Sequence, residues 1–179
     1  MATKATISWE QFLAAGEESR KWEWVGGEVC FMTPVNFRHE IVLARVITYL
    51  VEYCRLHPEW IWVPSNAVFT MSSGNWRLPD ASIVSRARLP QGRVPERRAE
   101  FSPDVAFEIL SPGNTAGEVQ LKKKDYQESG VTQVWIDLDK RVVELICPDR
   151  PLQFFREDQI LVIDSLPGFS LDLNSLFTV

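Results

Sequence analysis

The chain of 179 residues carries a formal net charge of −5, with 45% hydrophobic and 24% charged residues, which favours one domain over residues 1–179 and excludes a disordered chain. No apolar run approaches the ~20 residues of a membrane-spanning helix, and the N-terminal MATKATISWEQF lacks the apolar core of a signal peptide, so we expect a cytoplasmic protein. The acidic balance excludes a general polyanion binder, because non-specific nucleic-acid affinity rests on many lysine and arginine contacts, but it leaves open an enzyme that needs positive charge only locally.

The sequence pattern of the first third of the chain predicts a short helix, a β-hairpin and one long helix. Ser8 is placed as the N-cap of the short helix that follows it. Residues 21–32 alternate around the Gly26-Gly27 pair, which is typical of a hairpin. Residues 36–57 carry apolar side chains at helical spacing and stop before a proline, so they form the strongest predicted helix.

The rest of the chain predicts a series of strands and two more helices. The strands are expected at residues 60–63, 67–71, 80–85, 104–110, 134–138, 141–147 and 154–163. A helix is expected over residues 117–129, closed by Gly130 as its C-cap, and a short one near residues 173–177. This order predicts the α/β (α+β) class, with a mixed β-sheet flanked by helices and an N-terminal β-hairpin.

Residues 85–100 (SRARLPQGRVPERRAE) form an arginine-rich segment without apolar periodicity. Long irregular segments inside a compact domain are either functional or disordered. A solvated loop is the default interpretation. Contact with a phosphate backbone is the alternative.

Glu108 stands in the middle of an apolar strand, and an ionised carboxylate is costly to bury unless it is paired or binds a metal. Strand alternation puts Asp104 and Glu108 on one face, while the other face is wholly apolar and should pack against a helix. Asp104 lies four residues away, or ~13 Å along a strand, which is too far to share one metal ion with Glu108.

Asp80 opens another predicted strand. If that strand neighbours the strand of Glu108, the two carboxylates come close enough to share a divalent cation. Carboxylates, a main-chain carbonyl (here that of Ile109) and water are the oxygen ligands that Mg²⁺ prefers, and Mn²⁺ is the alternative ion. The sequence thus suggests a metal site that activates water and neutralises charge on a phosphate.

Lys122 is singled out from a run of three lysines by helical phase. Val119, Lys122 and Tyr126 share one helix face at i, i+3, i+7 spacing, so Lys122 should turn toward the sheet. An ammonium there can hold a phosphate oxygen or orient the attacking water. A purely structural ion pair between Lys122 and Glu108 is the competing interpretation.

Three further residues are auxiliary candidates. Glu40 begins the long helix, where it is either an additional acid of the site or a favourable charge at a helix N-terminus. His39 is interpreted first as a core or capping residue and second as a base. For Glu23, in the first hairpin, a cross-strand hydrogen bond is preferred over a place in the same cleft.

Several motifs in order resemble the Uma-two family of the PD-(D/E)XK restriction endonuclease-like superfamily. They are KWEWVGGEVCFM, FRHEIVLARVITYLVEY, RLPDASIV, SPDVAFEILSP, the helix with Lys122, QVWIDLD and LPGFSLDLNSLF. The resemblance implies a mixed sheet with flanking helices, dependence on a divalent metal and a nucleic-acid substrate. Asp80 and Glu108 match the two signature carboxylates. Leu110 stands where the signature lysine normally lies, and Lys122 on the following helix takes its place.

Together these observations predict a Mg²⁺- or Mn²⁺-dependent endonuclease, with DNA as the expected substrate. Asp80, Glu108 and Lys122 are its catalytic candidates. A homodimer is expected, because a small single-site nuclease cuts both strands of DNA most simply as a two-fold pair. The alternative is a catalytically inactive nucleic-acid-binding or interaction module that retains the fold.

Overall fold

The computed structural model describes residues 6–15, 21–32 and 35–178, and its centre is a six-stranded sheet in the order β11-β10-β9-β8-β7-β4. Strands β8 and β9 run parallel, and the other neighbours run antiparallel. The strands are β4 (Trp60–Pro64), β7 (Ala81–Ser85), β8 (Val105–Leu110), β9 (Thr132–Asp137), β10 (Val142–Ile146) and β11 (Gln153–Arg156). This mixed sheet confirms the predicted fold class.

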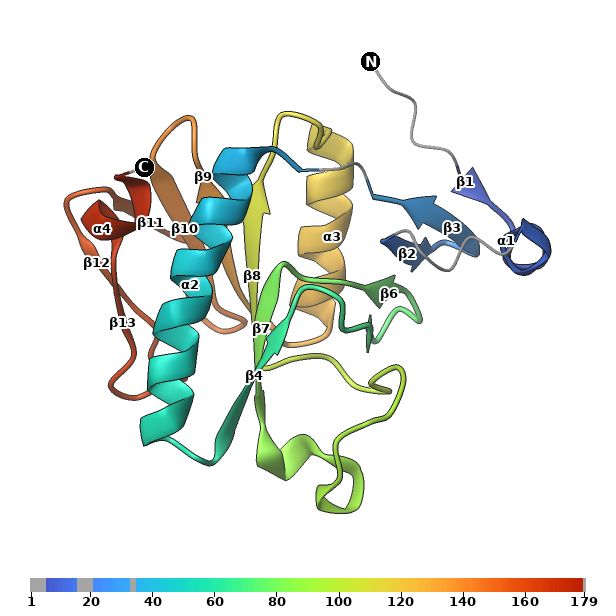
Figure 1. The fold of residues 1–179 in the computed structure, drawn as a ribbon, viewed down its shortest axis with the longest axis horizontal. Helices are drawn as coiled ribbons and strands as arrows, with labels where there is room; N and C mark the ends of the chain where they lie inside the picture. Colours follow the sequence, from blue (N-terminus) through green and yellow to red (C-terminus); the bar gives the residue numbers. More distant parts are fainter. Residues whose placement is uncertain (1–5, 16–20, 33–34, 179) are drawn as a thin grey trace.

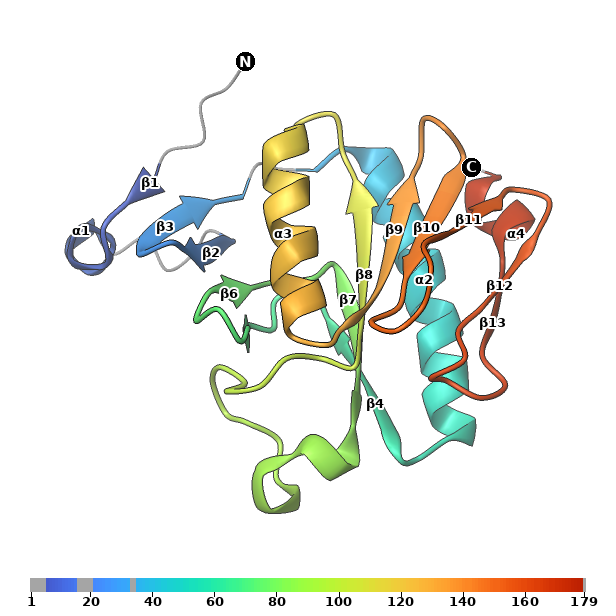
Figure 2. The same cartoon turned by 180° about the vertical axis from the view of Figure 1, so that it is seen from behind.

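The long helices α2 (Phe37–Leu56) and α3 (Ala116–Glu128) cover opposite faces of this sheet (Figures 1 and 2). Side-chain alternation along β8 assigns its residues to the two faces. Val105, Phe107 and Ile109 join the core under α2, whereas Ala106 belongs to the second core, which Tyr126 of α3 enters. The face of β8 that carries Glu108 is therefore the face under α3.

Both helices begin where a side chain satisfies their first free backbone N–H groups. Asn36 accepts a hydrogen bond from the backbone N–H of His39 at 2.9 Å and so caps α2. Thr115 and Glu118 form a reciprocal capping box at the start of α3. These caps fix the first turns of the two helices, and both turns lie at the C-terminal end of β8 (Figure 1).

A second, five-stranded sheet lies beside α3, in the order β1-β3-β2-β6-β5 (Figure 1). It consists of β1 (Thr6–Ile7), β2 (Trp22–Val25), β3 (Glu28–Phe31), β5 (Phe69–Thr70) and β6 (Trp76–Arg77). The predicted hairpin is confirmed as β2–β3, while β6 was not predicted. Helix α1 (Trp9–Ala15) contributes Trp9 and Phe12 to a cluster with the tryptophans of β2 and β6.

The prediction of one strand region over residues 154–163 is wrong, because the segment divides between two sheets. β11 ends at Arg156, and a turn closed by the N–H of Gln159 and the carbonyl of Arg156 reverses the chain. Strand β12 (Ile160–Val162) then pairs with β13 (Ser170–Asp172), which leads into α4 (Leu173–Phe177).

The arginine-rich segment contains two short 3₁₀ helices, Arg86–Arg88 and Pro90–Gly92, and is anchored by the buried side chains of Leu89 and Ala99. It lies at the end of the sheet opposite the C-terminal end of β8 (Figures 1 and 2). In the part of the chain that the structure describes, no helix is both long and apolar enough to cross a membrane.

Phe107→Ala is expected to lower the free energy of unfolding by about 3–5 kcal/mol, because the side chain is fully buried between β8 and α2. Urea unfolding followed by circular dichroism measures this loss. Phe154→Ala is the matched control: that phenylalanine is 59% exposed on the edge strand β11, so its loss should cost less than about 1 kcal/mol. Equal losses for the two variants would contradict the placement of the core.

Candidate active site

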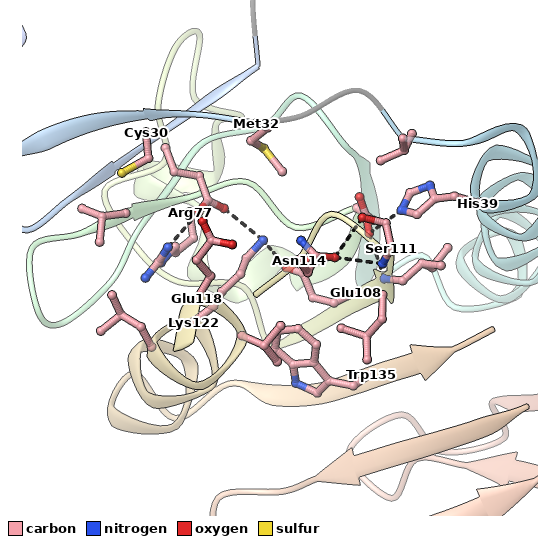
Figure 3. A pocket seen from close by; sticks show the side chains of 18 residues that line it. Cys30, Met32, His39, Arg77, Glu108, Ser111, Asn114, Glu118, Lys122 and Trp135 are labelled. Atoms are coloured by element: carbon pink, nitrogen blue, oxygen red, sulfur yellow. Dashed lines mark hydrogen bonds and ion pairs between the residues drawn. The ribbon is translucent and has the colours of Figure 1, made fainter. Parts of the chain in front are cut away.

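A pocket of about 130 Å³ opens at the C-terminal end of β8 (Figure 3). Its walls come from the first turn of α2, the inner face of α3, the β2–β3 hairpin and the end of β6. Figure 3 shows His39, Arg77 and Lys122 entering the pocket from three of these elements. The charged residues of its lining are Glu23, His39, Arg77, Asp80, Glu108, Glu118 and Lys122.

Glu108 and Lys122 form a buried ion pair on the α3 face of the sheet. The Nζ of Lys122 lies 2.7 Å from Oε1 of Glu108, and the hydroxyl of Tyr126 donates to the same oxygen at 2.6 Å. The side chains of Glu108 and Lys122 are only 8% and 10% exposed. Lys122 therefore points toward the sheet, as predicted.

Asp80 lies directly before β7 and meets Glu108 across the sheet. β7 and β8 pair antiparallel with Ala81 opposite Phe107, so one further step of this register places Asp80 opposite Glu108. Directly opposite residues have Cβ atoms about 4.5–5.5 Å apart and side chains on the same face. The strands that follow Asp80 and carry Glu108 are therefore neighbours, as predicted.

Two groups hold the Asp80 carboxylate. The backbone N–H of Ile109 donates to Oδ2 at 2.8 Å, and Nε2 of His39 lies 3.1 Å from the same oxygen. His39 is buried, which agrees with the core role that was preferred for it, and its hydrogen-bond partner is a candidate metal ligand. Burial lowers the pKa of His39, but the Asp80 carboxylate, with a smaller effect from Glu40, more than offsets this and raises the pKa.

Glu23 reaches the same cluster from the hairpin. Its Oε1 lies 2.9 Å from Nζ of Lys122 and accepts a hydrogen bond from the N–H of Leu78, while its Oε2 accepts from Nη1 of Arg77 at 2.7 Å. Because Arg77 is on β6, which pairs with β2, the preferred cross-strand hydrogen bond is present. The contact with Lys122 also places Glu23 in the cleft, which was the less favoured of its two predicted roles.

Arg77 and Asp125 are the members of the cluster that sequence reasoning missed. Nε of Arg77 donates to Oδ2 of Asp125 at 2.7 Å, and Asn75 and Ser73 donate to the same carboxylate. Asp125 lies three residues after Lys122, so the i, i+3 spacing was a usable signal. Arg77 gave none, because its strand is two residues long.

The cluster buries more carboxylates than permanently charged cations. Its four carboxylates face two permanent cations, and all six groups are less than 9% exposed (Glu23, Asp80, Glu108, Asp125, Arg77 and Lys122). Burial raises the pKa of Glu108 to about 7; Lys122 opposes this effect and Asp80 adds to it. Burial acts on Glu23 in the same direction, but Lys122 and Arg77 prevail and lower its pKa to about 2.

The pair Asp80–Glu108 has oxygens that fit a divalent cation. Among the described residues, no hydrogen bond or ion pair engages Oδ1 of Asp80 or Oε2 of Glu108, and both residues line the pocket. The N–H and C=O of one strand residue point to the same side. Since the N–H of Ile109 points at Asp80, its carbonyl also lies on the Asp80 side of β8.

Within the residues described, no cluster of three or more histidine, cysteine, aspartate or glutamate side chains could hold a metal ion. In the described part of the chain, the pocket therefore offers two carboxylates and a carbonyl. This set suits Mg²⁺ or Mn²⁺, which bind proteins through one or two carboxylates and complete their coordination with water and substrate phosphates. It does not suit a structural zinc site, which takes four protein ligands.

The remaining candidates lie outside the pocket lining. The side chain of Glu40 is 55% exposed, with Oε1 3.7 Å from Nδ1 of His39, so it is a charge in the first turn of α2. Asp104 caps the neighbouring strand: its carboxylate accepts from the N–H of Ser85 and pairs with Arg88 at 2.9 Å. The placement of Glu40 agrees with a favourable charge at the helix N-terminus, and Asp104 does not share a site with Glu108, as expected.

Comparison with known proteins gives one family and one similar fold. A family model described as "Uma2: Putative restriction endonuclease" matches residues 9–174. A crystal structure of a putative nuclease belonging to DUF820 from Anabaena variabilis is similar with a TM-score of 0.82 and 19% sequence identity, covering 96% of this chain and 98% of that one. No curated protein matches the sequence.

Glu108→Gln is expected to stabilise the metal-free protein more at pH 8 than at pH 5. A carboxyl whose pKa rises on folding, here from 4.5 to about 7, contributes stability below about pH 4.5 that is lost as the pH rises through 7. Glutamine is neutral at both pH values, so the gain in free energy of unfolding at pH 8 should exceed that at pH 5 by about 1–3 kcal/mol, measured by urea unfolding in EDTA.

Glu144→Gln is the control for this measurement. Glu144 pairs with Lys123, the neighbour of Lys122 on α3, and is partly exposed, so its loss should not stabilise the protein at either pH. A Glu108→Gln variant less stable than wild type at pH 8 would show that the Glu108–Lys122 pair is a stabilising structural contact.

Proposed function

The chain belongs to the Uma2 family, and we propose that it is a divalent-metal-dependent endonuclease that hydrolyses nucleic-acid phosphodiester bonds. The observation that carries this proposal is the convergence of Asp80, Glu108 and Lys122 in one pocket, from two neighbouring strands and the helix that covers them. Two carboxylates with one cation beside them form a set that can bind a metal ion and a phosphate together.

Asp80 and Glu108 would hold the metal ion, with the carbonyl of Ile109 as a third oxygen. Mg²⁺ or Mn²⁺ supplies Lewis-acid stabilisation of charge on the phosphate and lowers the pKa of water. His39 and the N–H of Ile109 keep the Asp80 carboxylate oriented through its Oδ2, which leaves Oδ1 for the ion. The two oxygens of Glu108 are divided in the same way: Lys122 and Tyr126 bind Oε1, and Oε2 is left for the ion.

Lys122 would stabilise the negative charge that develops on the phosphoryl oxygens, or position the water that attacks. It stays protonated in the folded protein: burial lowers the pKa of Lys122, but Glu108, Glu23 and Asp80 together raise it above its ordinary value. A permanent cation held 2.7 Å from Glu108 is close enough to contact a phosphate that approaches the pair.

We further propose DNA as the substrate and a homodimer as the working form. The description of the family as restriction endonucleases supports DNA. A two-fold pair would present one pocket to each strand of a duplex.

A catalytically inactive nucleic-acid-binding or interaction module that retains the fold is the second candidate. The completed Lys122–Glu108 ion pair favours it, because a structural ion pair would look the same. It predicts nucleic-acid binding without turnover.

Lys122→Ala is expected to lower the turnover number for DNA cleavage in Mg²⁺ or Mn²⁺ by about 10²–10³-fold, the usual cost of losing one charge-stabilising donor. Lys123→Ala is the matched control, since Lys123 pairs with Glu144 away from the pocket, and should stay within about threefold of wild type. Gel-based cleavage with purified variants, with EDTA as the metal-free control, measures both.

Three outcomes separate the candidates. Cleavage that needs metal and is lost in Lys122→Ala supports the endonuclease. Cleavage that survives both Lys122→Ala and Glu108→Gln would place the chemistry elsewhere. Binding without cleavage in either metal would favour the inactive module.

A further inference from the structure

The charged groups around Lys122 form a row of alternating sign that runs across four elements. It begins at Asp125 on α3, passes through Arg77 on β6 and Glu23 on β2, and ends at Lys122 and Glu108. Each successive pair of oppositely charged groups is in contact, and every member is buried. The proposed metal-binding pair, Asp80 and Glu108, lies at only one end of this row of charges.

Lys122 has a partner for each of its three ammonium protons. Glu108 Oε1 at 2.7 Å, Glu23 Oε1 at 2.9 Å and the carbonyl of Leu78 at 3.3 Å surround its Nζ. In the proposed enzyme Glu108 would serve two cations through different oxygens, the ammonium at Oε1 and a metal ion at Oε2. If Glu108 turns to the ion, Glu23 and Leu78 still hold the lysine.

Glu23 is itself rigidly held. Arg77 binds its Oε2 at 2.7 Å, and the N–H of Leu78 binds its Oε1 at 3.1 Å. Arg77 is fixed in turn by Asp125, whose two oxygens also accept from Asn75. Leu78 lies two residues before Asp80, so the same contacts also fix the chain segment that presents Asp80.

Resting on the proposed function, we infer that Glu23 is a positioning residue that keeps Lys122 beside the Asp80–Glu108 pair while Glu108 binds a divalent metal ion. Arg77 and Asp125 hold Glu23 in that position. Without Glu23, Lys122 has Glu108 as its only carboxylate partner within contact distance among the described residues, so the ammonium competes with the ion for the negative charge of Glu108.

This role predicts an effect on metal affinity that depends on Lys122. Glu23→Gln should raise the dissociation constant for Mn²⁺, measured from the electron paramagnetic resonance signal of the free ion, by about tenfold or more, which corresponds to one charged hydrogen bond redirected to Glu108. In a Lys122→Met background the same substitution should change the constant by less than about threefold, because no ammonium competes.

Two further variants complete the test. Asp125→Asn loosens Arg77 and should weaken Mn²⁺ binding in the same direction, again only when Lys122 is present. Glu144→Gln removes the same charge from a lysine–glutamate pair outside the pocket and should leave Mn²⁺ binding within about twofold. Thermal unfolding of each variant establishes that it is folded before titration.

Each result decides a different claim. If wild type binds Mn²⁺ and Glu23→Gln binds it equally well, the positioning role is wrong while the metal site stands. If Glu23→Gln weakens binding equally with and without Lys122, Glu23 acts through the general shape or charge of the pocket and not through the lysine. If wild type binds no Mn²⁺, or if Asp80→Asn does not remove the bound ion, the proposed metal dependence fails, and the positioning role fails with it.

Discussion

The contact of one lysine with two glutamates is the interaction on which the rest of the site depends. Lys122 comes from α3, Glu108 from the six-stranded sheet and Glu23 from the hairpin sheet, so one ammonium joins three separate elements. Burying these charges is costly unless every group is paired and hydrogen-bonded. Two carboxylates nevertheless meet at the end of the network, and burial raises the pKa of Glu108 to about 7. A divalent cation is the ligand that these two carboxylates would favour most.

The two faces of β8 have different roles, one in the apolar core and one in the candidate site. Residues 105, 107 and 109 of β8 enter an apolar core under α2, which makes the strand rigid. The opposite face of the same strand then presents Glu108 toward α3 without disturbing that core. On the far side of α3, the aromatic cluster of the second sheet fixes β2 and β6, which supply Glu23 and Arg77. The apolar core under α2 and the candidate chemistry therefore lie on opposite faces of β8.

Local patterns in the sequence predicted the candidate catalytic residues but not Arg77 and Asp125, which support them. Alternation singled out Glu108, and helical phase singled out Lys122, because both patterns depend on residues within one element. Arg77 could not be found in this way. Its partners Glu23 and Asp125 are 54 and 48 residues away, and its strand is too short to show a period. The division of residues 154–163 failed for a related reason: a tight turn between two apolar stretches resembles one strand until the two sheets are seen.

A structure determined from crystals soaked in Mn²⁺ tests the central claim most directly. Anomalous density between Asp80 Oδ1 and Glu108 Oε2, at ligand distances of about 2.0–2.3 Å and within reach of the Ile109 carbonyl, is the predicted result. Lys122 should then remain on Glu23 and the carbonyl of Leu78. The account is contradicted if the soaked protein shows no ion at this pair, or if the Lys122–Glu108 contact persists unchanged while Mn²⁺ binds elsewhere.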